Sequence, residues 1–138
     1  MAPSARRSSQ QVWKKFEAVH DTPQIGDKMI VIKEPYTSLI LNGDKTMELR
    51  CRRVTGQYYL ADSTTHTVKG RLTFGAHQKL TQEDYEATRH LHCVDDPKMR
   101  YKRTVGTHIT TVERLVHAPA YKTTKGAIGF ARFAPPAA

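Results

Sequence analysis

The chain has 138 residues, which is enough for one domain with a substantial buried core, and it carries a formal net charge of +9 at pH 7. Its uninterrupted apolar runs, such as residues 29–32, are far too short to cross a bilayer, and two cysteines are too few for a disulfide framework. We therefore predict an intracellular protein without membrane association, cytoplasmic as the first choice, with mitochondrial and nuclear locations left open.

Residues 1–28 form a predicted basic arm that continues into an amphipathic helix. The first eight residues are basic and polar, as in a disordered tail. Ser8 and Gln11 fit a capping box, so a helix should follow. Its apolar stripe comprises Val12, Trp13, Phe16 and Val19. We favour an arm that packs on the domain or on a partner, although an organellar transit peptide has a similar composition.

Residues 29–134 form the predicted domain, and residues 135–138 form a C-terminal tail. A β-branched strand at 29–32 leads into a short helix within residues 34–43, where Pro35 suits the first turn and Gly43 the left-handed end. Further strands are expected at 46–50, 56–63, 68–77, 107–118 and 126–133.

A second helix has the clearest start signal of the chain. Thr81 is a suitable N-cap, two acidic residues follow in the first turn, and Leu80 can form a hydrophobic staple with Tyr85. The helix should end near Cys93. Several strands with few helices predict an α+β domain whose sheet curls into a small barrel.

A resemblance follows from the run VIKEPYTSLILNGDKTMELR, residues 31–50, together with the later segments GQYYLADS, VKGRLTF and KGAIGFARF. With these residues the chain resembles the ASCH domain family of the PUA-like superfamily over about residues 29–133. The resemblance implies a small PUA-like β-barrel flanked by short helices, here with an N-terminal helical extension. It also implies a cleft at one end of the barrel. Relatives in the superfamily bind RNA or read modified bases, and some ASCH members are reported as nucleases or as amidohydrolases acting on acetylated cytidine.

The strand at 46–50 carries the residues of this cleft. Side chains two apart in a strand share a face, so Thr46, Glu48 and Arg50 should point one way, with Lys45 leaning toward them from the turn. Such a group beside an apolar wall could hold a base or a phosphate. The predicted nucleotide site comprises Lys45, Thr46, Glu48, Arg50, Arg52 and Arg53. The alternative is an ion-pair network that only closes the mouth of the barrel.

An enzymatic role for Lys45 and Glu48 meets a mismatch. The resemblance implies a nucleophilic Thr three positions after the Lys, and Glu48 occupies that position here. Two neighbouring positive charges would also keep the Glu48 carboxylate ionised, which makes it a weak general base. Amide hydrolysis is therefore disfavoured and we lean against an enzyme. A nuclease stays open, because Lys45 and Arg50 could stabilise phosphate charge while a histidine transfers protons.

The segment HLHC invites a metal site. On a helix, however, His90 and His92 project about 200 degrees apart, and no second Cys/His pair stands at ligand spacing. We expect neither a metal nor another cofactor.

The distribution of charge points to RNA. Residues 98–138 carry eight Lys or Arg against one acidic residue, whereas residues 54–97 carry four against six. Phosphates are natural partners for such an excess, because neutralising them releases condensed counterions. The alternative is a solvated basic face that only aids solubility.

Aromatic residues lie among these basic ones. The segment KMRYKR, a predicted RNA-backbone contact, includes Lys98, Arg100, Tyr101, Lys102 and Arg103. Its alternative is a solvated loop. Tyr58 and Tyr59 should lie on opposite faces of one strand, so one packs in the core while the other could stack on a base.

We therefore predict an RNA-binding protein, either free-standing or a subunit of a ribonucleoprotein such as a ribosome. The alternative is a nuclease or a nucleoside-modifying hydrolase that uses the same cleft.

Overall fold

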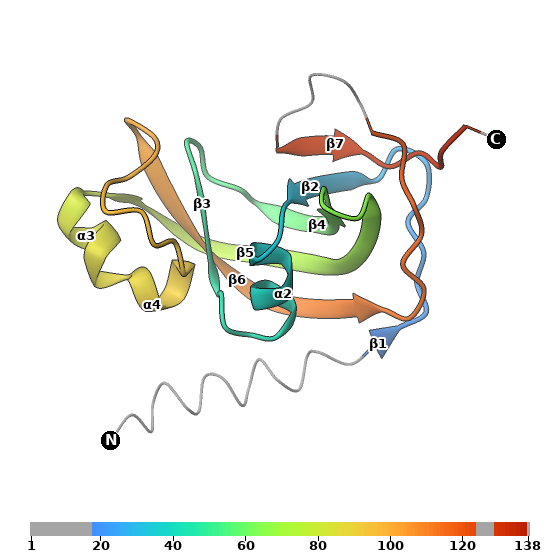
Figure 1. Cartoon of the computed structure of the whole chain (residues 1–138), viewed down its shortest axis with the longest axis horizontal. Helices are drawn as coiled ribbons and strands as arrows, with labels where there is room; N and C mark the ends of the chain where they lie inside the picture. Colours follow the sequence, from blue (N-terminus) through green and yellow to red (C-terminus); the bar gives the residue numbers. More distant parts are fainter. Residues whose placement is uncertain (1–17, 124–128, 138) are drawn as a thin grey trace.

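The computed structural model describes residues 18–123 and 129–137, which form one sheet with short helices beside it (Figure 1). The strands are β1 (Ala18–Val19), β2 (Lys28–Ile32), β3 (Met47–Arg50), β4 (Gly56–Asp62), β5 (Thr67–Leu80), β6 (Thr104–Leu115) and β7 (Phe130–Arg132). The helices are α2 (Tyr36–Leu41), α3 (Gln82–Ala87) and α4 (Arg89–His92). Among the described residues, no helix is long and apolar enough to cross a membrane.

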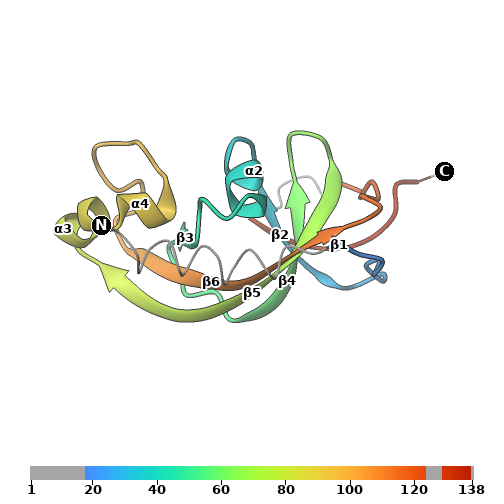
Figure 2. The ribbon, with the colours of Figure 1, turned by 90° about the horizontal axis from the view of Figure 1, so that it is seen from below.

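The long strands β5 and β6 form the centre of the sheet. They pair antiparallel from Gly70↔Arg114 to Leu80↔Thr104, with two register shifts in between. Seen along the layer in Figure 2, they form a curved surface with α2, α3 and α4 on one side. Apolar side chains that alternate along the strands meet α2 there, and the core includes Ile30, Ile40, Leu60, Leu72 and Val112.

The sheet is not closed into a barrel. Its strand order is β1-β6-β5-β4-β2-β7, with β3 paired to β6 beside this path, so within the described residues β7 meets neither β1 nor β3. The mostly β architecture with a few short helices is confirmed and is compatible with a PUA-like fold. The predicted closed barrel is not confirmed.

The predicted N-terminal helix is wrong at its last position. Val19 lies in β1, which pairs in parallel with β6 through Val19↔Leu115, and its carbonyl accepts a hydrogen bond from Val116 N at 2.8 Å. Hydrogen bonding to the edge of β6 therefore decides the conformation of Val19, although its spacing from the earlier apolar residues suits a helix. The remainder of the predicted helix lies outside the described residues.

The other local predictions are largely confirmed. Helix α2 follows Pro35 and ends before Gly43, which has a φ of +84°. Helix α3 starts at the predicted N-cap Thr81. The structure adds a full capping box, in which the Thr81 hydroxyl accepts from Asp84 N and the Asp84 carboxylate accepts from Thr81 N, both at 3.1 Å. The chain leaves helical geometry at Thr88, however, so one predicted helix is two.

The predicted C-terminal strands are shifted or shortened. The strand expected at 107–118 is β6, which starts three residues earlier. The strand expected at 126–133 is described only as the three residues of β7, and part of it lies outside the described residues.

Candidate functional site

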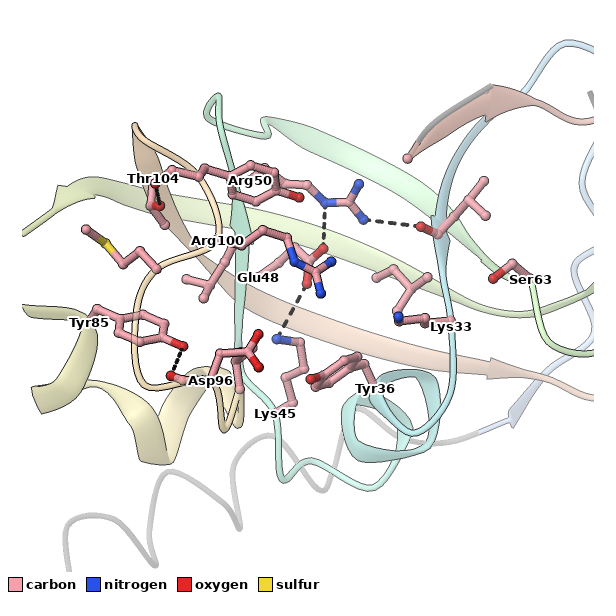
Figure 3. Close-up of a pocket in the computed structure, with 17 residues that line it drawn as sticks. Lys33, Tyr36, Lys45, Glu48, Arg50, Ser63, Tyr85, Asp96, Arg100 and Thr104 are labelled. Carbon is pink, nitrogen blue, oxygen red and sulfur yellow. Dashed lines mark hydrogen bonds and ion pairs between the residues drawn. The ribbon is translucent and has the colours of Figure 1, made fainter. Parts of the chain in front are cut away.

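A cavity of about 420 Å³ opens beside β3 (Figure 3). Strand β3 forms its back, the end of β2 and the start of α2 form one side, and the segment before β6 forms the other. The polar and aromatic residues that line it are Lys33, Tyr36, Lys45, Glu48, Arg50, Ser63, Tyr85, Asp96, Arg100, Tyr101 and Thr104. Apolar lining comes from Val31, Ile32, Leu49, Val94 and Met99, and Gly129 completes the wall.

An ion-pair chain centred on Glu48 lies at the bottom of this pocket. Lys45 Nζ is 3.5 Å from one carboxylate oxygen, and Arg50 Nε is 2.6 Å from the other. Only 1% of the Lys45 side chain, 8% of Glu48 and 15% of Arg50 is exposed. The alternation along β3 places Glu48 and Arg50 on one face, and Lys45 reaches Glu48 from the turn before the strand, as the sequence predicts. We call Lys45, Glu48 and Arg50 the inner ion-pair group.

Lys45 has its hydrogen-bonding capacity filled by the protein itself. Besides Glu48, Nζ donates to the carbonyls of Met47 at 2.9 Å and His92 at 2.7 Å. An ammonium carries three hydrogens, so all three have an acceptor. Burial lowers the pKa of Lys45, and the Glu48 carboxylate opposes that shift. Lys45 therefore joins β3 to the end of α4, and these acceptors hold it as a cation.

Arg50 reaches across the gap between β3 and β2. Its Nη2 donates to the carbonyl of Val31 at 3.2 Å, and its guanidinium lies 5.2 Å from the centre of the Phe130 ring. A Cβ added at Gly129 would overlap Nη1 of Arg50. The Arg50 side chain therefore links β3 to β2, two strands that are not paired through their backbones in the described part of the chain. Among the described residues, Glu48 and Val31 accept from two of the five guanidinium N–H groups, and the other three have no described acceptor.

Two cations on the outer edge of the pocket have no such partners. Lys33 follows β2 and Arg100 lies before β6, and both are exposed. Within the described ranges, neither side chain forms an ion pair with a carboxylate. We call Lys33 and Arg100 the rim cations. Their positive charge is available to an anionic ligand.

The segment that carries Arg100 is held against α3 and α4 through backbone oxygens. The Tyr85 hydroxyl donates to the carbonyl of Asp96 at 2.6 Å, and Gln82 Nε2 donates to that of Pro97 at 2.8 Å. Arg89 also donates to the carbonyls of Val94 and Asp96. The helices therefore position this side of the pocket.

Tyr36 supplies an aromatic wall. Its ring lies 5.2 Å from Lys45 Nζ, and it is partly exposed. Burial raises the pKa of the Tyr36 phenol, and the negative charge of Asp96 raises it further. The phenol therefore stays protonated at neutral pH and can donate a hydrogen bond into the pocket.

The structure combines parts of both predicted RNA-contact regions. Lys45, Glu48, Arg50, Arg100 and Tyr101 line one pocket, although the two segments are about fifty residues apart in the chain. The other predicted residues do not line it: Thr46, Arg52, Arg53, Lys98, Lys102 and Arg103. Strand β3 ends at Arg50 and the chain then bends, which takes the next two arginines out of the strand alternation.

Sequence reasoning missed several lining residues. Lys33 and Tyr36 belong to the run that carries the ASCH resemblance, so their position around Pro35 was an available signal. Asp96 and Ser63 lie in polar loops without any pattern that would identify them.

The histidines take no part in the pocket. All seven lie in the described ranges, and none lines it, so the predicted proton transfer by a histidine has no candidate there. His92 is buried; Nε2 lies 2.7 Å from the carbonyl of Tyr85 and Nδ1 accepts from Val94 N at 3.0 Å. Burial lowers the pKa of His92. Across the described residues, no three His, Cys, Asp or Glu side chains are placed to hold a metal ion.

Comparison with known proteins supports the fold. No family model matches the sequence, and no curated protein is similar to it at a significant level. Among solved structures, the chain is similar to the crystal structure of a mutant of ZmASCH from Zymomonas mobilis, with a TM-score of 0.62. The two share 10% sequence identity over 82% of this chain and 92% of that chain. The chain therefore has an ASCH-like fold.

Proposed function

We propose that this protein binds RNA and that its pocket accepts one unstacked nucleotide. The observation that carries the proposal is the pairing of unsatisfied cations with aromatic rings around one cavity. The rim cations lie on the same pocket as the rings of Tyr36 and Tyr101. A nucleotide requires this combination, because it has a flat apolar base and a charged phosphate.

The size and floor of the pocket suit such a ligand. Its volume of about 420 Å³ lies in the range of small-ligand sites, roughly 300–1,000 Å³. Glu48 at the bottom has lone pairs left after its two cationic neighbours, since a carboxylate offers about four acceptor positions. It can therefore accept a hydrogen bond from the exocyclic amino group of a base. The spare N–H groups of Arg50 can donate to a carbonyl or phosphate beside it.

The charge outside the pocket supports a polymeric ligand. The net charge is +9, and Arg52, Arg53, Lys98, Lys102 and Arg103 are all exposed. These side chains can follow a phosphate backbone without reading its sequence. A single-stranded RNA that places one base in the pocket uses both features.

A titration of labelled single-stranded RNA by fluorescence anisotropy tests the proposal. Affinity should fall steeply between about 50 and 200 mM salt, and Arg100→Ala should weaken binding and reduce the salt slope by about one. Lys79→Ala is the control, because Lys79 is an exposed cation that neither lines the pocket nor belongs to the segments assigned to the RNA backbone. Binding without salt dependence, or an effect of Lys79→Ala as large as that of Arg100→Ala, would contradict the proposal.

The same proposal includes a subunit of a ribonucleoprotein such as a ribosome. Sedimentation of the chain from cell extract, before and after ribonuclease treatment, separates this form from a free-standing binder. Migration with large particles that is lost after ribonuclease treatment indicates the subunit.

A nuclease or nucleoside-modifying hydrolase in the same pocket is the second candidate. One observation favours it: burial lowers the pKa of Lys45, and perturbed lysines in clefts are common at catalytic sites. The three acceptors around Nζ argue against proton abstraction by Lys45. Incubation with RNA and with acetylated cytidine should yield products that disappear in Glu48→Gln if the candidate holds. Absence of products, or products that persist in Glu48→Gln, rejects it.

A further inference from the structure

We propose that a second nucleobase stacks on Phe130, immediately outside the pocket, so that the protein binds two consecutive unpaired nucleotides. This inference rests on the proposed function of the pocket. It assigns the ligand as single-stranded RNA, because a duplex does not offer the faces of its bases.

Phe130 exposes much of its apolar ring to water, a contact that does not stabilise the protein. It lies on β7, and 42% of it is exposed. In the described part of the chain, the other large apolar residues this exposed are Ile25 and Val116, which have no ring. Phe130 therefore presents an aromatic surface that is open to a planar ligand.

The ring is held in place from within the protein. Phe130 lies against Tyr58 with ring centroids 5.7 Å apart, and Tyr58 meets the buried Phe74 edge to face at 6.0 Å. Strand β7 pairs with β2 through Ile30↔Phe130. A ring fixed by packing and backbone pairing loses little conformational entropy when a base stacks on it.

Cations flank these rings. The Arg50 guanidinium lies 5.2 Å from the centre of Phe130, and Lys28 Nζ lies 4.7 Å from the centre of Tyr58. Stacking rings with positive charges beside them are the combination used by proteins that bind single strands. A docking surface for an apolar peptide would not require these two charges.

Arg50 connects the ring surface with the pocket. It lines the pocket, pairs with Glu48 inside it and contacts Phe130 outside it. Gly129, the residue before Phe130, also lines the pocket. A base in the pocket and a base on Phe130 would therefore lie on either side of one guanidinium. The phosphate that joins the two nucleotides would pass near Arg50, which can neutralise it.

Affinities of a nucleoside monophosphate and of the corresponding dinucleotide, measured by calorimetry on the full chain, test this inference. A stacked second base should make the dinucleotide bind about tenfold tighter or more. Phe130→Leu removes the ring while keeping an apolar side chain, and it should bring the affinity ratio of dinucleotide to mononucleotide close to one. Phe130→Trp should keep or raise the ratio, because its ring surface is larger.

The ratio separates stacking from indirect effects. If Phe130 only positioned Arg50, Phe130→Leu would weaken both ligands equally and leave the ratio unchanged, which would overturn the inference. Ile25→Ala is the control for loss of an exposed apolar side chain and should leave the ratio as it is. Failure of the wild-type chain to bind either ligand would contradict the proposed function itself. Mononucleotide binding with no gain for the dinucleotide would contradict only the second site.

Discussion

The inner ion-pair group and the rim cations line the same pocket but use their charges differently. The inner side chains are largely buried, and their hydrogen bonds end on Glu48 and on backbone carbonyls. The rim cations are exposed and, by the geometry of the described residues, pair with no carboxylate. Charge held by the protein mainly organises the site, whereas unpaired charge at its edge is available to a ligand. Variants of the two groups should therefore separate stability from binding.

The largest effect is expected for Lys45→Met. The substitution removes a buried ammonium and leaves two carbonyls without their donor, so the free energy of unfolding should fall by about 3 kcal/mol. Chemical denaturation measures this loss. Lys33→Met, the matched change at a rim cation, should alter stability by less than about 0.5 kcal/mol. Equal losses in the two variants would remove the distinction between the groups.

Gly129→Ala should have the next largest effect on stability, because the added methyl group would collide with Arg50 where its side chain packs against the residue before β7. Gly129 has a φ of +84°, and its new Cβ would overlap Arg50 Nη1. Gly26→Ala is a matched control, since Gly26 has a φ of +94° and no atom within 4 Å of an added Cβ. Backbone strain should cost about 1 kcal/mol in both, and Gly129→Ala should cost more and also weaken RNA binding. The comparison fails if the two variants unfold at the same denaturant concentration.

A smaller effect on stability is expected from protonation of His92, the residue whose backbone carbonyl accepts from Lys45. Because the folded pKa of His92 is lowered from its usual value of 6.5, the unfolded chain binds this proton more readily. The neutral His92 ring therefore contributes fully to the free energy of unfolding above about pH 6.5, and this contribution declines as the pH falls below that value. Denaturation midpoints between about pH 7.5 and 5 should show this decline. His90→Gln, at an exposed neighbour, should keep the pH dependence, whereas His92→Gln should reduce it.

The smallest change in stability is expected for Arg100→Ala. Arg100 is exposed and forms no ion pair with any described residue, so its loss should alter the unfolding free energy by less than about 0.5 kcal/mol. Its effect should appear in RNA affinity instead. If the denaturation curve shifted as far as that of Lys45→Met, Arg100 would stabilise the fold as the inner ion-pair group does, and the distinction between the two groups would be wrong.

Local patterns predicted many of the elements well. The N-cap at Thr81 and the end of α2 at Gly43 depend on residues within a few positions of each other. The inner ion-pair group was also predictable, because strand alternation alone places Glu48 and Arg50 on one face. Patterns failed where a distant segment competed. Val19 joined the edge of β6. Arg52 and Arg53 failed for another reason, since they follow the end of β3 and do not line the pocket.

The sequence by itself determined the helix caps, the alternation of β3, the excess of positive charge and the resemblance to ASCH domains. Only the tertiary structure decided which charges share a pocket. Lys45 meets the carbonyl of His92, which is 47 positions away, and Arg50 meets that of Val31, 19 positions away. The position of Arg100 depends on backbone oxygens of its segment that bond to side chains of α3 and α4. Such contacts depend on how the chain packs, and short-range spacing in the sequence does not encode them.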